Sequence, residues 1–176
     1  MYPLIIRLGG FLTFAVVLTG CASTEVGSYV ARGADLHSHR TYSWGPVEER
    51  STGDPRLDNN PFFQQRVQTA VDTQLASRGF EKTASPPHFL VHFHASVAQE
   101  IQVSPSEHDV ACEECRPEVY DQGSILIDIV DARSGLLAWR GWAKGSIDGV
   151  IDNQAWMEQR VDEAVARIMR ELPRDL

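Results

Sequence analysis

Alternating apolar and polar residues in the middle of the chain restrict its fold more than any other feature. In residues 89–97 apolar side chains occupy every second position, and residues 124–130 repeat the pattern with isoleucines on one face. Successive side chains of a strand point to opposite faces, so each segment predicts a strand. Residues 131–135 predict a turn, and residues 136–143 predict the hairpin partner of the second strand. The centre of the chain therefore predicts an antiparallel sheet with one face packed on the core and the other partly exposed to solvent.

Two further segments predict helices. Asn60-Pro61 is typical of an N-cap followed by proline at the first helical position, and Gly79 stands where a C-terminal cap belongs. The second helix is expected over residues 153–172, because Pro173 ends it. The two apolar stripes are Phe63, Val67, Ala70, Val71 and Leu75, and Met157, Val161, Ala164, Val165, Ile168 and Leu172. With a short strand at residues 41–44, the expected class is α+β: a mainly antiparallel sheet of about four strands with two helices on one face.

The N-terminal residues predict an export signal. Arg7 is the only charge in residues 1–20, and an apolar run follows it that is too short to span a bilayer. Leu18-Thr19-Gly20-Cys21 resembles the bacterial lipobox, in which the cysteine is lipidated and the signal is cut before it. We therefore expect acyl chains such as palmitate on Cys21 to hold the protein on the membrane. The alternative is an ordinary cleaved signal in which Cys21 is unmodified.

The residues after the cysteine bear on localisation and domain organisation. Ala22 and Ser23 follow Cys21, and the absence of aspartate there favours the outer membrane, facing the periplasm. Residues 22–40 are rich in Gly, Ser and Ala, which is typical of a linker. The expected organisation is a signal peptide over 1–20, a lipidated cysteine and flexible tether over 21–40, and a single α+β domain over 41–176.

The charge balance excludes one class of partner. The chain has 176 residues, with 16 Lys and Arg against 24 Asp and Glu, and a formal net charge of -8. Phosphate binding requires a basic surface, so this acidic balance argues against nucleic acid. The expected partners are the membrane, through the lipid anchor, and another protein of the cell envelope.

Short motifs spread over residues 41–173 have the spacing of a known family. They include Tyr42-x-Trp44, Asn60-Pro61 with Ala70-Val71, the run Gly123-x-Ile125-x-Ile127-Asp128-Ile129-x-Asp131, Leu137-x-Trp139-Arg140-Gly141, and Ala164-Val165 with Leu172-Pro173. This pattern resembles the bacterial lipoprotein family catalogued as domain of unknown function 4136. The sequence departs from it at His88, where an acidic residue is expected, and over residues 108–115. The resemblance implies a fold and a location but no reaction.

Five residues could form a metal site. His92 and His94 are alternate residues of a strand and therefore face the same side. His108, Cys112 and Cys115 follow with a spacing that lets both sulfurs and one imidazole bind a single ion, which suits zinc or copper. The alternatives are a disulfide between Cys112 and Cys115, and histidines that are simply surface residues. No metal or other cofactor is required by the remainder of the sequence.

Asp128 and Arg140 predict a cross-strand ion pair. If Val130 lies opposite Ala138 in the hairpin, Asp128 lies opposite Arg140 and Leu126 opposite Trp142. The familiar catalytic motifs are absent from the sequence, so we expect no enzyme. The leading hypothesis is a lipid-anchored periplasmic domain that binds another macromolecule or serves envelope maintenance. The alternatives are a metal-binding lipoprotein and an envelope hydrolase with an unrecognised motif.

Overall fold

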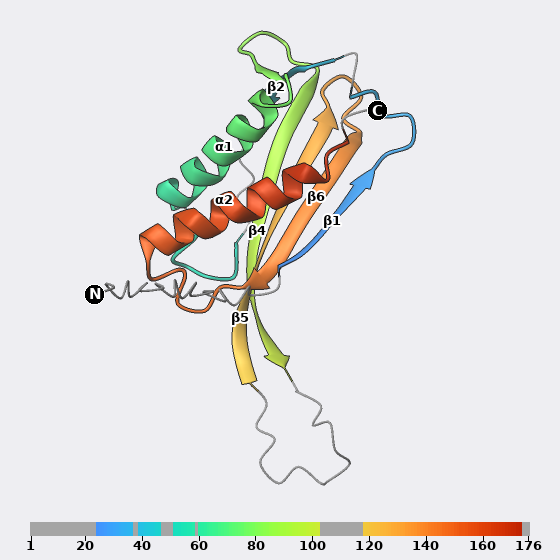
Figure 1. The fold of residues 1–176 in the computed structure, drawn as a ribbon. Helices are drawn as coiled ribbons and strands as arrows, with labels where there is room; N and C mark the ends of the chain where they lie inside the picture. Colours follow the sequence, from blue (N-terminus) through green and yellow to red (C-terminus); the bar gives the residue numbers. More distant parts are fainter. Residues whose placement is uncertain (1–23, 37–38, 47–50, 59, 103–117, 174–176) are drawn as a thin grey trace, which may run out of the picture.

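The computed structural model describes residues 24–36, 39–46, 51–58, 60–102 and 118–173, and within these ranges it contains a six-stranded sheet and two helices (Figure 1). In chain order the elements are β1 (Glu25–Val30), β2 (Thr41–Trp44), α1 (Pro61–Ala76), β3 (Glu81–Lys82), β4 (Phe89–Gln102), β5 (Glu118–Asp131), β6 (Leu137–Ser146) and α2 (Gln154–Arg170).

The predicted α+β class is confirmed, but the sheet is larger and more mixed than predicted. Its strand order is β1-β6-β5-β4-β2-β3. The pairs β1/β6, β6/β5 and β5/β4 are antiparallel, whereas β2 is parallel to both β4 and β3. Helix α1 lies between β2 and β4 in the chain, and a crossover of this kind brings the second strand back in the same direction. The four expected strands correspond to β2, β4, β5 and β6. Strand β1 and the two-residue β3 were not among them.

Strand β1 corrects the predicted tether. Residues 21–40 were assigned to a flexible linker, yet Glu25–Val30 pairs with β6 along its whole length, from Glu25 opposite Lys144 to Val30 opposite Trp139. Val26 and Val30 pack against the core. Gly27 and Ser28 interrupt the apolar alternation, and the strand is stabilised by a partner more than a hundred residues away in the sequence. The folded domain therefore begins near residue 25 rather than at residue 41.

Both helices cover the same face of the sheet, as predicted, and they run in the same direction (Figure 1). The side chain of Asn60 accepts hydrogen bonds from the backbone N–H groups of Phe62 and Phe63, and Asn153 caps α2 in the same way through Trp156. Helix α2 lies over β6, β1 and β5, with α1 beside it. The core lies between helices and sheet, and its most deeply buried side chains include Val67, Leu75, Ile127, Ile129, Trp139, Val165, Ile168 and Met169.

The β4–β5 hairpin is longer than the alternation predicted. The two strands pair from Phe89 opposite Asp131 to Gln102 opposite Glu118, and their outer ends extend beyond the other strands (Figure 1). The predicted segments 89–97 and 124–130 are the inner parts, which the helices cover. The outer parts have no apolar alternation because no second layer packs on them.

Candidate functional site

The sheet face opposite the helices carries most of the residues that the sequence singled out. The apolar residues of β4, β5 and β6 point to the helices, so the residues between them form the uncovered face. Register places His92, Asp128, Arg140 and Tyr29 in one row across β4, β5, β6 and β1. The neighbouring row contains His94, Leu126 and Trp142. Four strands thus bring two histidines, an ion pair and two aromatic rings onto one surface.

Asp128 and Arg140 lie opposite each other and form a two-pronged ion pair. Arg140 Nε and Nη2 donate to the two carboxylate oxygens of Asp128 at 2.6 and 2.7 Å. The hydrogen bond to Asp128 raises the pKa of the Arg140 guanidinium. Asp128 is only 6% exposed, whereas 42% of the Arg140 side chain is accessible. The pair therefore holds the guanidinium in one orientation at the surface.

The predicted hairpin register is confirmed at Asp128 and at Leu126, but it is wrong at the turn. Val130 pairs with Leu137, not with Ala138, because a bulge lies between Ile129 and Val130. A bulge places one extra residue on one strand, and sequence alternation contains no signal for it.

The two histidines of the predicted metal site lie on the uncovered face. His94 Nε2 lies 3.9 Å from Asp128 Oδ2, and the ring of His92 packs so closely on Gly45 that an added Cβ would overlap it. Since the carboxylate of Asp128 already accepts two bonds from Arg140, it is not a free ligand for an ion. Among the described residues, no three His, Cys, Asp or Glu side chains come together in a way that would hold a metal ion.

The remaining predicted site residues, His108, Cys112, Cys115 and the lipidation residue Cys21, lie outside the described residues. The described strands on either side of residues 103–117 are β4 and β5. Gln102 and Glu118, the last paired residues, are about 26 Å along the strand from His94. The histidine pair and the Cys-x-x-Cys pair can be tested by separate substitutions.

A hydrogen-bonded cluster that the sequence analysis missed joins β2 to α1. Tyr42 Oη and Trp44 Nε1 both donate to Asp72 Oδ1, at 2.8 and 2.9 Å, and Lys82 Nζ lies 2.8 Å from the other oxygen. Burial raises the pKa of the Tyr42 phenol, and the hydrogen bond to Asp72 raises it further. The spacing of Tyr42 and Trp44 on one strand face was visible in the sequence, but their shared acceptor on the helix was not.

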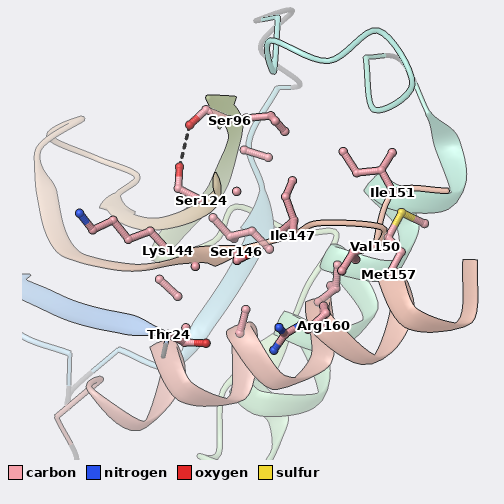
Figure 2. Close-up of a pocket in the computed structure, with 18 of the residues that line it drawn as sticks. Thr24, Ser96, Ser124, Lys144, Ser146, Ile147, Val150, Ile151, Met157 and Arg160 are labelled. Atoms are coloured by element: carbon pink, nitrogen blue, oxygen red, sulfur yellow. Dashed lines mark hydrogen bonds between the residues drawn. The ribbon is translucent and has the colours of Figure 1, made fainter. Parts of the chain in front are cut away.

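An apolar cavity, also missed, lies between α2, the middle of β4 and β5, and the C-terminal end of β6 (Figure 2). Its volume is about 90 Å³. Its walls are mainly aliphatic and aromatic, and they include Phe63, Ile125, Ala143, Ile147, Val150, Val161 and Ala164. Thr24, Lys144 and Arg160 belong to the lining as well, and Glu25, which lies 3.0 Å from Lys144, raises the pKa of that lysine. The lining comes from segments that are far apart in the sequence, from Thr24 to Ala164, so no single stretch of sequence predicts it.

These features define a two-layer α+β domain with one covered and one uncovered sheet face. The chain belongs to the family described as Domain of unknown function (DUF4136), whose model matches residues 26–174. The match begins within β1, in agreement with the corrected start of the domain. His88, where the sequence departs from the family pattern, stacks on His39 at 4.2 Å between ring centroids and lies 2.6 Å from the Thr41 hydroxyl through Nδ1.

One solved structure shares the fold at low sequence identity, and a second is similar at a lower score. A PDZ domain protein from Parabacteroides distasonis matches with a TM-score of 0.55 and 11% identity over 86% of this chain. The chain spans only 37% of that protein's length. The PelC dodecamer from Paraburkholderia phytofirmans matches with a TM-score of 0.47 and 9% identity, over 85% of this chain and 97% of that chain. No curated protein matches this sequence. In the part of the chain that the structure describes, no helix has the length and apolar character needed to cross a membrane.

Proposed function

We propose that the protein is a lipid-anchored, non-enzymatic domain of the bacterial cell envelope that binds another envelope protein through its uncovered sheet face. The lipobox at Cys21 supports the anchor, and Ala22 and Ser23 support an outer-membrane location facing the periplasm. The resemblance to a family of bacterial lipoproteins points the same way.

The observation that carries the binding proposal is the fixed guanidinium of Arg140 among exposed aromatic side chains. Arg, Tyr and Trp are the residue types that contribute most to protein interfaces. Tyr29 is 53% exposed and lies directly opposite Arg140, and the partly exposed Trp142 lies on the same face. Because Asp128 already orients the guanidinium, a partner would order few side chains when it binds.

Site-specific photo-crosslinking in cells tests this proposal. A benzophenone side chain at Tyr29 probes the uncovered face, and the same group at Gln159, exposed on α2, is the matched control. We expect a discrete protein adduct from position 29 that Arg140→Ala abolishes, and none from position 159. Equal adducts from both positions would contradict a specific face.

Lipidation and the absence of catalysis need their own measurements. Mass spectrometry of the membrane-extracted protein should find acyl chains on Cys21, and Cys21→Ser should release the protein from the membrane. Turnover of ester, glycan or phosphate substrates that a single substitution abolishes would instead favour the hydrolase hypothesis.

Metal binding is the second candidate, favoured by the placement of His92 and His94 on one face. Elemental analysis of protein purified without chelator or reductant tests it. Zinc or copper that is lost in Cys112→Ser/Cys115→Ser but retained in His92→Ala/His94→Ala would assign the ion to the loop. A disulfide between Cys112 and Cys115 in periplasmic material would remove the thiolate ligands and contradict a loop site.

A further inference from the structure

The cavity under α2 has the size and the walls of a hydrocarbon site. Its volume is about 90 Å³, and aliphatic side chains of β5, of the segment between β6 and α2, and of α2 line it. An engineered apolar cavity of about 150 Å³ stays dry and binds benzene. The smaller cavity accommodates the last carbons of an aliphatic chain against its apolar walls, and Lys144 and Arg160 are the cationic side chains of the lining.

The cavity lies where the chain would leave the membrane. Thr24, at the start of β1, is one of its lining residues (Figure 2). Cys21 is three residues earlier in the sequence, and a fully extended chain of that length spans at most about 11 Å. Lipid on Cys21, or a bilayer in which that lipid is embedded, therefore lies within reach of the cavity.

Exposed aromatic residues gather at the same end of the molecule. Phe62 and Trp156 lie in the first turns of α1 and α2, which run in the same direction, and they are 67% and 57% exposed. Phe63 and Met157, their neighbours in sequence, line the cavity. Trp is enriched where proteins meet the membrane–water interface, and apolar side chains bury there. Arg66, one turn into α1, contacts Asp162 and Glu158 of α2.

We propose that the cavity under α2 binds one fatty-acyl chain, with Phe62 and Trp156 holding its open side at the bilayer surface. The orientation toward the membrane depends on the proposed lipid anchor, but the binding of an acyl chain does not. The chain can come from a membrane phospholipid or from the lipid on Cys21, and both sources supply the same hydrocarbon.

The test measures binding of cis-parinaric acid, a fluorescent fatty acid, to the full chain with Cys21→Ser. Ala164→Phe fills the cavity, whereas Ala70→Phe adds the same ring to α1 outside it. We expect one saturable site that Ala164→Phe weakens by about tenfold or more and Ala70→Phe leaves unchanged. The Cys21→Ser protein and its two variants carry the same N-terminus, so any binding of the probe by that segment contributes equally to all three measurements. Absence of saturable binding, or equal affinity in all three, would overturn the proposal.

A second measurement covers the case in which Ala164→Phe fails to fold. A photoactivatable fatty acid with its diazirine near the methyl end should label peptides around Ala95–Val97 and Met157–Ala164 in the protein with native walls. Labelling confined to other peptides would refute the site.

Comparison with the natural, lipidated protein then identifies the source of the acyl chain. If the protein's own acyl chain fills the cavity, the lipidated protein binds no probe. If bilayer lipid fills it, the lipidated protein binds the probe as the Cys21→Ser protein does. Because the binding arm uses Cys21→Ser, its failure is distinguishable from failure of the lipid-anchor proposal.

Discussion

Single glycines in this protein provide space for aromatic rings. Gly141 lies under the buried ring of Trp139 and beside Ile168 of α2, and an added Cβ would overlap both. Gly27 has the same relation to Trp142 on the uncovered face. The family motif Trp139-Arg140-Gly141 thus has a packing reason: a large ring and the glycine two positions later share one face of β6.

We expect Gly141→Ala to lower the free energy of unfolding by about 1–3 kcal/mol, because the methyl group over-packs a core in which Trp139 has no room to move. Gly27→Ala is the matched comparison, since Trp142 is partly exposed and can shift toward solvent. Urea denaturation of the two variants should show the larger loss for Gly141→Ala. A larger loss for Gly27→Ala would contradict this packing argument.

Asp72 contributes as an acceptor for the buried Tyr42 hydroxyl. We expect Asp72→Ala to destabilise the domain by about 1–3 kcal/mol. The buried Tyr42 hydroxyl would then have neither its protein acceptor nor water as a hydrogen-bond partner. In a Tyr42→Phe background the same substitution should cost less, since that donor is already absent. A double-mutant cycle by urea denaturation measures the difference. Strictly additive losses would show that the two side chains are energetically independent.

At the scale of elements, the β5–β6 turn depends on an ionised carboxylate. Asp131 Oδ1 accepts hydrogen bonds from the backbone N–H groups of Arg133 and Ser134 and from the Ser134 hydroxyl. These bonds lower the pKa of Asp131, and the bond from the Ser134 hydroxyl has the largest effect. A lowered pKa in the folded state means that the stabilisation is present above the unfolded value of about 3.9 and is lost as pH falls through the folded value.

We therefore expect thermal stability to decrease below about pH 4, and Asp131→Asn to make that decrease shallower while lowering stability at pH 7. Melting temperatures of both proteins between pH 7 and pH 2.5 test this. Asp148→Asn is the control, because Asp148 also accepts a backbone N–H, that of Asp121, and the Ser146 hydroxyl, but belongs to a different loop. An unchanged pH profile in Asp131→Asn would show that other carboxylates dominate acid unfolding.

Elements were predictable from the sequence where their periodicity was strong. The caps at Asn60 and Asn153, the inner strands and the two helices follow from local pattern. Strand β1 was missed because Ser28 occupies the position between Val26 and Val30 on their shared face, and its partner β6 is remote in sequence. The bulge after Ile129 and the two-residue β3 also depend on neighbouring strands rather than on local sequence.

At the scale of the whole molecule, the helix N-termini, the cavity and the start of β1 lie at one end, and the β5–β6 turn lies at the other (Figure 1). The outer parts of β4 and β5 extend from the same end as the helix N-termini, so they would also face the bilayer, and the uncovered sheet face would lie to the side (Figure 1). The proposed bilayer contact and the proposed partner surface therefore use different parts of the molecule.

We expect Phe62→Ser/Trp156→Ser to reduce co-sedimentation of the Cys21→Ser protein with neutral phosphatidylcholine vesicles, because both substitutions remove exposed apolar surface. Leu136→Ser is the matched control, since Leu136 is 69% exposed at the opposite end. The difference should persist at high salt, as apolar contacts are not screened. Equal loss from the control would show that vesicle binding is not localised to the helix N-termini.

The sequence by itself determined the α+β class, the two capped helices, the inner strands and the pairing of Asp128 with Arg140, because each depends on residues close in the chain or on one hairpin. It also predicted the lipid anchor at Cys21 and the metal ligands, which lie largely outside the described residues. Only the tertiary structure decided the mixed sheet with β1 at its edge, the Asp72 cluster, the cavity and the composition of the uncovered face. Each of these joins segments that are distant in sequence, and long-range contacts follow from packing that no local pattern encodes.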